Sequence, residues 1–143
     1  MTFRGHFDYS LDAKHRLNVP PRFRAAFAAG VVLSPDFEPC VGIWAPDRFD
    51  EFTAAFLQRL NPISPERRKL ERFFGRAFDT EIDAGGRVTL PQKLLEHAGI
   101  EREVALIGRI DHLEIWDRAR WDAYEPELEV DAPAIAEGVG HPS

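Results

Sequence analysis

An internal repeat is the feature of this sequence that most constrains its fold. Residues 7–20, FDYSLDAKHRLNVP, align with residues 78–91, FDTEIDAGGRVTLP, at a shift of 71 positions. The identical pairs are Phe7/Phe78, Asp8/Asp79, Asp12/Asp83, Ala13/Ala84, Arg16/Arg87 and Pro20/Pro91. The similarity resumes at a shift of 72, where Ile43-Trp44 matches Ile115-Trp116. Two matching stretches in the same order indicate two copies of one unit, which we place at residues 6–52 and 77–124.

Each copy predicts the same series of elements. An alternating strand comes first, followed by a polar turn, a short second strand and a helix opened by Pro20 or Pro91. A strand pair and a closing helix complete each copy. The expected strands cover 3–11, 17–19, 31–33 and 41–44 in the first copy, and 77–82, 88–90, 104–107 and 113–116 in the second.

The segments outside the two copies differ in character. Residues 53–76 are expected to be a helical insertion, because helical spacing of apolar residues predicts an antiparallel helix pair over about 46–60 and 65–75. Residues 125–143 are rich in small residues, Pro and Gly, without an apolar period. They are expected to form a flexible C-terminal tail.

The size of the repeat predicts how the copies associate. The chain has 143 residues, and isolated hairpins of short strands are marginally stable in water. The two copies should therefore pack on each other. We expect a mainly β fold with peripheral helices, in which the β elements form a barrel-like core with pseudo-two-fold symmetry.

The charge distribution gives conflicting indications about a nucleic-acid partner. The net charge is −6, which taken alone argues against such a partner. However, residues 1–24 hold five basic and two acidic residues, and residues 59–76 hold six basic and two acidic residues. Residues 111–143 hold nine acidic residues and two basic ones. Basic charge is therefore concentrated in two segments, one of which contains the first polar turn.

The polar turns, Asp12 to Arg16 and Asp83 to Arg87, permit two interpretations. In the structural one, the aspartate caps the amides of the turn and pairs with the arginine four residues later. In the functional one, the aspartate orients the arginine, which contacts DNA phosphates or guanine. Three basic residues near the start of the following helices could reach the same surface: Arg22, Arg24 and Lys93.

Several motifs together resemble a known family. They are Phe3-Arg4-Gly5, the two Asp-x-x-x-Arg turns, the Val-Pro and Leu-Pro steps, the stretch from Asn61 to Arg68, and Ile115 to Asp117. Over residues 3–124 the combination resembles the MraZ family of bacterial transcriptional regulators, which have two SpoVT/AbrB-like repeats.

The resemblance carries expectations about fold and function. It implies a swapped-hairpin or double-split β-barrel of AbrB type and a ring-shaped homo-oligomer, an octamer or a dodecamer. It implies a cytoplasmic, nucleoid-associated protein that binds direct repeats in the promoter of the division and cell-wall gene cluster. It also implies that DNA binding resides in Asp12 with Arg16 and in Asp83 with Arg87.

The full set of expected DNA-binding residues combines the resemblance with the local charge. It comprises Arg4, Asp12, Lys14, His15, Arg16, Arg22, Arg24, Asp83, Arg87 and Lys93. The chain departs from the family at His15, where glycine is usual, and at Gly85, where the second turn lacks a basic residue. We therefore expect the first turn to make the main contact.

Other classes of function have weaker support. The histidines form no His-Glu-x-x-His motif, Asp8 and Asp12 have no third ligand nearby in the sequence, and Cys40 suits a small core residue. We expect no enzyme activity, cofactor or metal. No apolar run approaches the ~20 residues of a membrane span, and the first residues do not resemble a signal peptide, so we expect a cytoplasmic protein. An antitoxin-like protein and an oligomeric scaffold that binds no DNA remain as alternatives.

Overall fold

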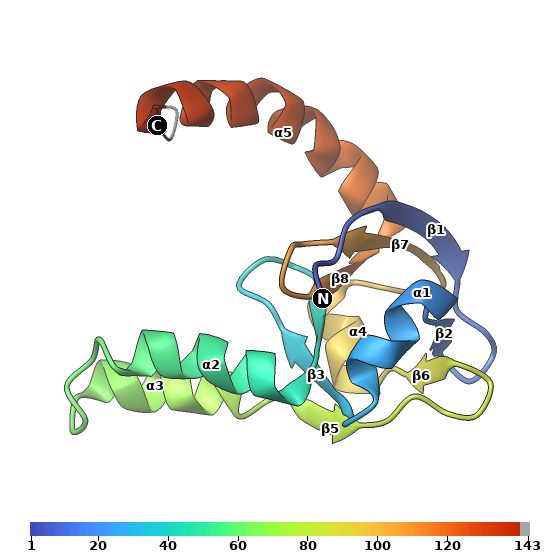
Figure 1. Cartoon of the computed structure of the whole chain (residues 1–143), viewed down its shortest axis with the longest axis horizontal. Coiled ribbons are helices and arrows are strands. Elements are labelled where there is room, and N and C mark those ends of the chain that lie inside the picture. The colour runs from blue at the N-terminus through green and yellow to red at the C-terminus, as the bar shows by residue number, and fades with distance from the viewer. Residues whose placement is uncertain (141–143) are drawn as a thin grey trace.

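The computed structural model describes residues 1–140 and consists of a β core with helices at its periphery (Figure 1). The first repeat contains β1 (His6–Ser10), β2 (Arg16–Asn18), α1 (Pro21–Arg24), the 3₁₀ turn η1 (Ala25–Phe27), β3 (Val31–Pro35), β4 (Val41–Trp44) and α2 (Pro46–Leu57). After α3 (Pro65–Phe74), the second repeat contains β5 (Phe78–Thr80), β6 (Arg87–Thr89), α4 (Gln92–Ala98), β7 (Glu103–Gly108), β8 (Leu113–Asp117) and α5 (Arg118–Val139).

Strand pairing crosses between the repeats. The six-stranded antiparallel sheet has the order β1-β7-β8-β4-β3-β5, and β2 pairs with β6 in a separate two-stranded ribbon. The first strand of each repeat thus lies beside a later strand of the other repeat. This confirms the mainly β, hairpin-swapped arrangement with peripheral helices, in which neither repeat completes its sheet alone.

The centre of the six-stranded sheet lies on the pseudo-two-fold axis. Strands β4 and β8 pair there, with Gly42 opposite Glu114. These two residues occupy equivalent positions in the repeats, at the shift of 72. The axis therefore passes between them, and the flanking pairs Val41–Ile115 and Ile43–Leu113 are related by it.

One apolar core serves both repeats. Leu17 and Val88, the middle residues of β2 and β6, are fully buried, as are Leu33 and Leu106 in the large sheet. Burying a side chain of this size contributes roughly 1.5–3 kcal/mol. Because each repeat supplies half of these residues, the core forms only when the two repeats are together.

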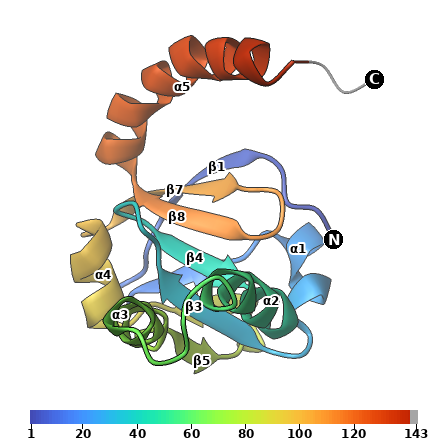
Figure 2. The same ribbon diagram turned by 90° about the vertical axis from the view of Figure 1, so that its left-hand side faces the viewer.

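The helix pair α2 and α3 projects from the side of β3 (Figures 1 and 2). The Ser64 hydroxyl caps α3 by accepting a hydrogen bond from the Arg67 amide at 3.1 Å. Aromatic side chains hold the pair together, with Phe37 of the β3–β4 connection stacked on Phe73 at 5.3 Å between ring centroids. Phe56 and Phe74 also contact this ring.

The C-terminal segment differs from the expectation. Residues 125–139 belong to the segment 125–143 that is expected to be a flexible tail, but they continue helix α5, which arches away from the sheet (Figure 2). Residues 141–143 of that segment lie outside the described residues. Trp121 and Tyr124 attach the first turns of α5 to Trp116. Beyond Glu125 every described side chain is exposed, so the absence of an apolar period reflects the absence of packing and does not prevent a helical backbone. Across residues 1–140, no helix is both long and apolar enough to cross a membrane.

Candidate nucleic-acid interface

The β2–β6 ribbon brings the two Asp-x-x-x-Arg turns side by side. Arg16 lies opposite Thr89, and Asn18 lies opposite Arg87. The middle residues of both strands point into the core. Because side chains alternate along a strand, the four polar residues share the outer face of the ribbon.

The first turn is held by the Asp12 carboxylate. Its Oδ1 accepts hydrogen bonds from the amides of Lys14 and Arg16, both at 2.9 Å. Its Oδ2 accepts the Nε–H of Arg16 at 2.6 Å. The aspartate therefore caps the turn and pairs with the arginine four residues later, as the structural interpretation predicts. Contact of the arginine with DNA stays a prediction.

The second turn repeats this arrangement. Asp83 Oδ1 accepts from the amides of Gly85 and Arg87 at 2.9 Å, and its Oδ2 accepts from Arg87 Nε at 3.2 Å. The turns are also joined across the axis. The Val19 amide donates to the Gly86 carbonyl and the Leu90 amide donates to the His15 carbonyl, each at 2.9 Å.

The electrostatics of both turns favour ionised aspartates. Hydrogen bonding from the Arg16 amide is the main cause that lowers the pKa of Asp12, and the Arg16 side chain adds to it. The Arg87 amide does the same for the pKa of Asp83, with the charge of Arg87 next in lowering it. A carboxylate that accepts several N–H donors is stabilised in its charged form.

The two turns share a left-handed residue. Gly86 has a φ of 81°, and His15 at the equivalent position has a φ of 57°. The histidine thus adopts the conformation that glycine adopts in the second turn. Left-handed backbone costs an L residue roughly 1–2 kcal/mol. The His15 side chain is exposed beside Lys14 and Arg16.

Arg24 connects the first repeat to the second turn. Its Nε donates to the Val19 carbonyl at 2.8 Å. Its guanidinium lies against Gly86, where a Cβ atom would collide with it. A basic residue of the first repeat is therefore placed at the turn that has Gly85 where the first turn has Lys14.

The remaining predicted residues lie in two other places. Arg22 stacks over Phe7 and Phe23 and donates to the Arg4 carbonyl at 3.1 Å, so it forms a basic pair with Arg4 near the N-terminus. Lys93 lines an open cavity of about 740 Å³ together with Arg76 and His97. The contacts of the two turns include none of these three predicted residues.

Sequence reasoning missed Asn18 and Thr89. Both are exposed on the outer face of the ribbon, between the two arginines. The signal was present in the alternation Arg-Leu-Asn and Arg-Val-Thr, in which only the middle residue is apolar. Side-chain amides and hydroxyls are groups that hydrogen-bond to base edges.

Comparison with known proteins agrees with this duplicated geometry. A family model described as "MraZ protein, putative antitoxin-like" matches residues 2–73 and again residues 73–137. The chain belongs to the MraZ family. Its two matches fall on the two halves that pair in the β2–β6 ribbon.

Individual MraZ relatives align over nearly the whole chain. "Transcriptional regulator MraZ" of Acetivibrio thermocellus is 32% identical over 136 residues, covering 94% of each chain. The protein of the same name from Treponema pallidum (strain Nichols) is 35% identical over 137 residues, covering 94% of this chain and 92% of the relative. That of Hydrogenovibrio crunogenus is 36% identical over 132 residues, covering 88% and 86%.

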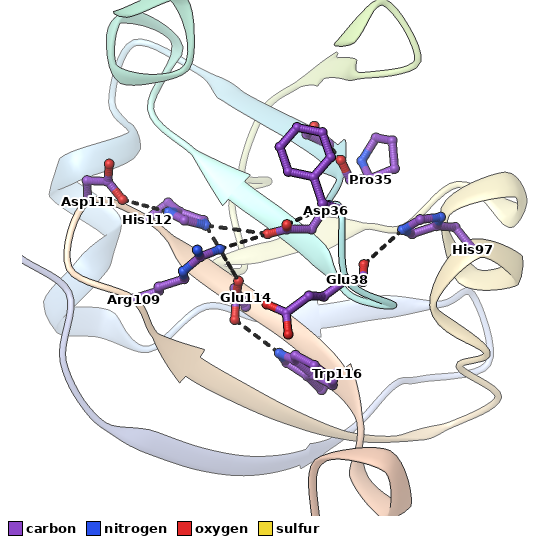
Figure 3. Close-up of polar contacts among 11 residues, drawn as sticks. Pro35, Asp36, Glu38, His97, Arg109, Asp111, His112, Glu114 and Trp116 are labelled. Atoms are coloured by element: carbon purple, nitrogen blue, oxygen red, sulfur yellow. Dashed lines mark hydrogen bonds and ion pairs between the residues drawn. The ribbon is translucent and has the colours of Figure 1, made fainter. Parts of the chain in front are cut away.

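A separate polar cluster lies outside the ribbon. Asp36, His112 and Glu114 come from the β3–β4 connection and the β7–β8 hairpin, and their side chains converge (Figure 3). Among residues 1–140, these three form the group of His, Cys, Asp or Glu side chains whose ligand atoms are close enough to share a metal ion.

Proposed function

We propose that this chain is a sequence-specific, DNA-binding transcriptional regulator that uses the β2–β6 ribbon as its reading element. The observation that carries the proposal is the placement of both Asp-x-x-x-Arg turns on one antiparallel ribbon with a polar outer face. A two-stranded ribbon fits the major groove of B-DNA. The relatives are named transcriptional regulators, which agrees with this role.

The side chains of the ribbon and its turns would contact either the bases or the phosphates of DNA. Asp12 and Asp83 engage the Nε edges of Arg16 and Arg87. The terminal Nη groups of both arginines would then contact phosphate or guanine. Asn18 and Thr89 lie between them and supply further base contacts. Lys14, His15 and Arg24 add contacts at the turns, chiefly to phosphates.

The net charge of −6 would repel DNA if it were evenly spread. DNA binding must therefore be confined to a basic part of the surface and repeated in several subunits. We propose that several copies form a ring of octamer or dodecamer type, which presents one ribbon per subunit toward DNA. A cyclic assembly presents identical elements at regular intervals, which suits direct repeats. Linked contacts raise the affinity by ~10²–10⁴ over a single contact.

The proposed target is a set of direct repeats in the promoter of the division and cell-wall gene cluster, in the cytoplasmic nucleoid. The test is native mass measurement, with and without DNA from upstream of the protein's own gene. Salt-dependent anisotropy on the same DNA accompanies it. We expect a ring that binds DNA with an affinity that falls steeply as salt rises. Equal binding to repeats of scrambled spacing would contradict recognition of direct repeats by a ring.

The antitoxin-like and scaffold alternatives have one supporting observation each. The family description contains the term "antitoxin-like", which supports the antitoxin. The net charge of −6 supports a scaffold that binds no DNA. The same experiment separates them from the regulator. A ring that shows no salt-dependent DNA binding would favour a scaffold, and capture of a toxin, with or without DNA binding, would favour the antitoxin.

A further inference from the structure

A second site lies at the pseudo-two-fold axis of the sheet. Glu114 of β8 faces Gly42 across the axis, His112 comes from the β7–β8 hairpin just before it, and Asp36 follows β3. Asp36 belongs to the first repeat, and the other two belong to the second. Figure 3 shows the three side chains directed toward one another.

The His112 ring is fixed in orientation and has one nitrogen without a partner. The ring is 3% exposed and stacks on Trp44 at 3.8 Å between centroids, with the planes 7° apart. Its Nδ1 lies 2.7 Å from Asp111 Oδ1, which identifies Nδ1 as the protonated nitrogen, because only a donor binds a carboxylate at that distance. The buried Nε2 makes no hydrogen bond and presents its lone pair to the cluster.

The distances around Nε2 suit an ion held between the groups. Nε2 lies 3.8 Å from Glu114 Oε2 and 4.0 Å from Asp36 Oδ2. Both separations are too long for a hydrogen bond. Two ligands of a tetrahedral zinc ion, with bonds of about 2.0–2.2 Å, lie roughly 3.3–3.6 Å apart. The two Nε2–oxygen separations would therefore need to contract by about half an ångström for one ion to bind, and all three ligand atoms already lie within 4.8 Å of one another.

The other oxygen of each carboxylate is already held in place. Glu114 Oε1 accepts from the indole Nε1 of Trp116 at 3.1 Å. Asp36 Oδ1 accepts from the Phe37 amide at 2.6 Å. Oε2 and Oδ2 are thereby left directed at the cluster. Outer hydrogen bonds of this kind, including the one that His112 donates to Asp111, are the ones that orient metal ligands in proteins.

The geometry points to a binding site for one divalent transition metal of the zinc class, with His112 Nε2, Glu114 Oε2 and Asp36 Oδ2 as its protein ligands. One imidazole and two carboxylates form a donor set that zinc accepts. Water would supply the fourth ligand. The sequence predicted no metal, because local spacing does not show that residue 36 meets residues 112 and 114.

Arg109 is the competitor of the metal. Its Nη1 lies 2.8 Å from Glu114 Oε2 and 3.1 Å from Asp36 Oδ2, the same two oxygens. The guanidinium neutralises one of the two carboxylates, while burial raises the pKa of Glu114. The Arg109 side chain is 51% exposed, so it can turn into solvent when a metal takes its place.

The proposed metal site has no symmetry-related copy on the other side of the pseudo-two-fold axis. The residues equivalent to His112 and Glu114 in the first repeat are Cys40 and Gly42, at the shift of 72. The first repeat therefore has no equivalent imidazole and carboxylate, and we expect one metal ion per chain. The ion would join the two repeats through Asp36 on one side and the β7–β8 hairpin on the other.

The test uses the full chain, stripped of metal with a chelator and dialysed. Zn²⁺ is added in a calorimetric titration, and Co²⁺ is added as a probe whose visible absorption reports tetrahedral coordination. We expect one Zn²⁺ per chain and a rise in the melting temperature. His112→Phe, which retains an aromatic ring against Trp44, should weaken Zn²⁺ binding at least about tenfold.

One further variant, with two controls, keeps the proposal testable if His112→Phe does not fold. Arg109→Met removes the competing cation and should tighten Zn²⁺ binding, whereas the control His97→Gln, at a half-buried histidine outside the cluster, should leave it unchanged. Arg16→Ala should also leave it unchanged, which separates this site from DNA binding. An absence of stoichiometric Zn²⁺ binding, or binding that Arg109→Met does not tighten, would overturn the proposal.

Discussion

The guanidinium of Arg24 covers the α-carbon of Gly86, although the two residues belong to different repeats. This contact places a first-repeat cation on the second-repeat turn. A Cβ atom at position 86 would meet the far end of the Arg24 side chain, so glycine leaves room there for this cation, whereas the first turn carries His15 at the equivalent position. The two turns are therefore equivalent in backbone but differ in how their basic charge is supplied.

Substitution at Gly86 should be costly. In Gly86→Ala the alanine must adopt a φ of 81°, which costs roughly 1–2 kcal/mol of unfolding free energy. Its Cβ atom also meets the Arg24 guanidinium, which must shift. Chemical denaturation measures this loss. The control is Gly85→Ala, whose Cβ would meet the movable end of Arg87. Equal losses in the two variants would show that Arg24 and the left-handed backbone do not matter.

His15→Gly should not destabilise the protein. Glycine removes the left-handed cost of roughly 1–2 kcal/mol but loses about 0.5–1 kcal/mol through the entropy of the unfolded chain. The net effect on unfolding free energy is a gain of between zero and about 1.5 kcal/mol. Thermal melting checks the sign. A clear drop in the melting temperature would indicate that the imidazole makes a stabilising contact.

The two arginines of the ribbon should differ in their effect on DNA binding. Arg16→Ala should lower DNA affinity by about 1–3 kcal/mol. Its melting temperature should change little, since a partly exposed ion pair contributes about 0–1 kcal/mol. Arg87→Ala should have a smaller effect on affinity, because the second turn carries Gly85 where the first carries Lys14. Anisotropy titrations compare the two, and equal losses would contradict a dominant first turn.

Phosphate and base contacts should be separable by salt. Lys14→Ala should reduce the slope of log affinity against log salt by about one, if Lys14 neutralises one phosphate. Asn18→Ala should leave that slope unchanged and should instead relax the preference for one base in the repeat. Titrations at several salt concentrations, on native and single-base variant DNA, distinguish the outcomes. If Asn18→Ala lowered the salt slope and Lys14→Ala relaxed the base preference, Asn18 would contact the phosphate and Lys14 the base.

The aspartates of the turns should contribute to acid stability. Their pKa values are lowered in the folded chain, so their contribution is present above the unfolded pKa of about 3.9 and is lost as the pH falls through the folded value. In Asp12→Asn/Asp83→Asn, the unfolding free energy should depend less on pH below about 4. Denaturation at pH 3 and pH 6 tests this. If the unfolding free energy of the double variant falls as much between pH 6 and pH 3 as that of the unsubstituted protein, other carboxyl groups cause the acid sensitivity.

Local patterns were sufficient for much of the β core and for the helix pair. The alternation around Leu17 and Val88 predicted the two short strands, and Ser64-Pro65 predicted the start of α3. Such signals work because side-chain alternation and capping depend on neighbours in the chain. The same reasoning failed for α5 beyond residue 125, because an unpacked helix has no apolar period to detect.

The sequence by itself determined that the chain is a duplicated unit and that each copy carries one aspartate-held turn with an arginine four residues later. Both properties depend on residue order alone. Only the tertiary structure decided that the turns lie on one ribbon, that Arg24 covers Gly86, and that Asp36 meets His112 and Glu114. These contacts join residues far apart in the chain, and they exist because neither repeat can bury its core without the other.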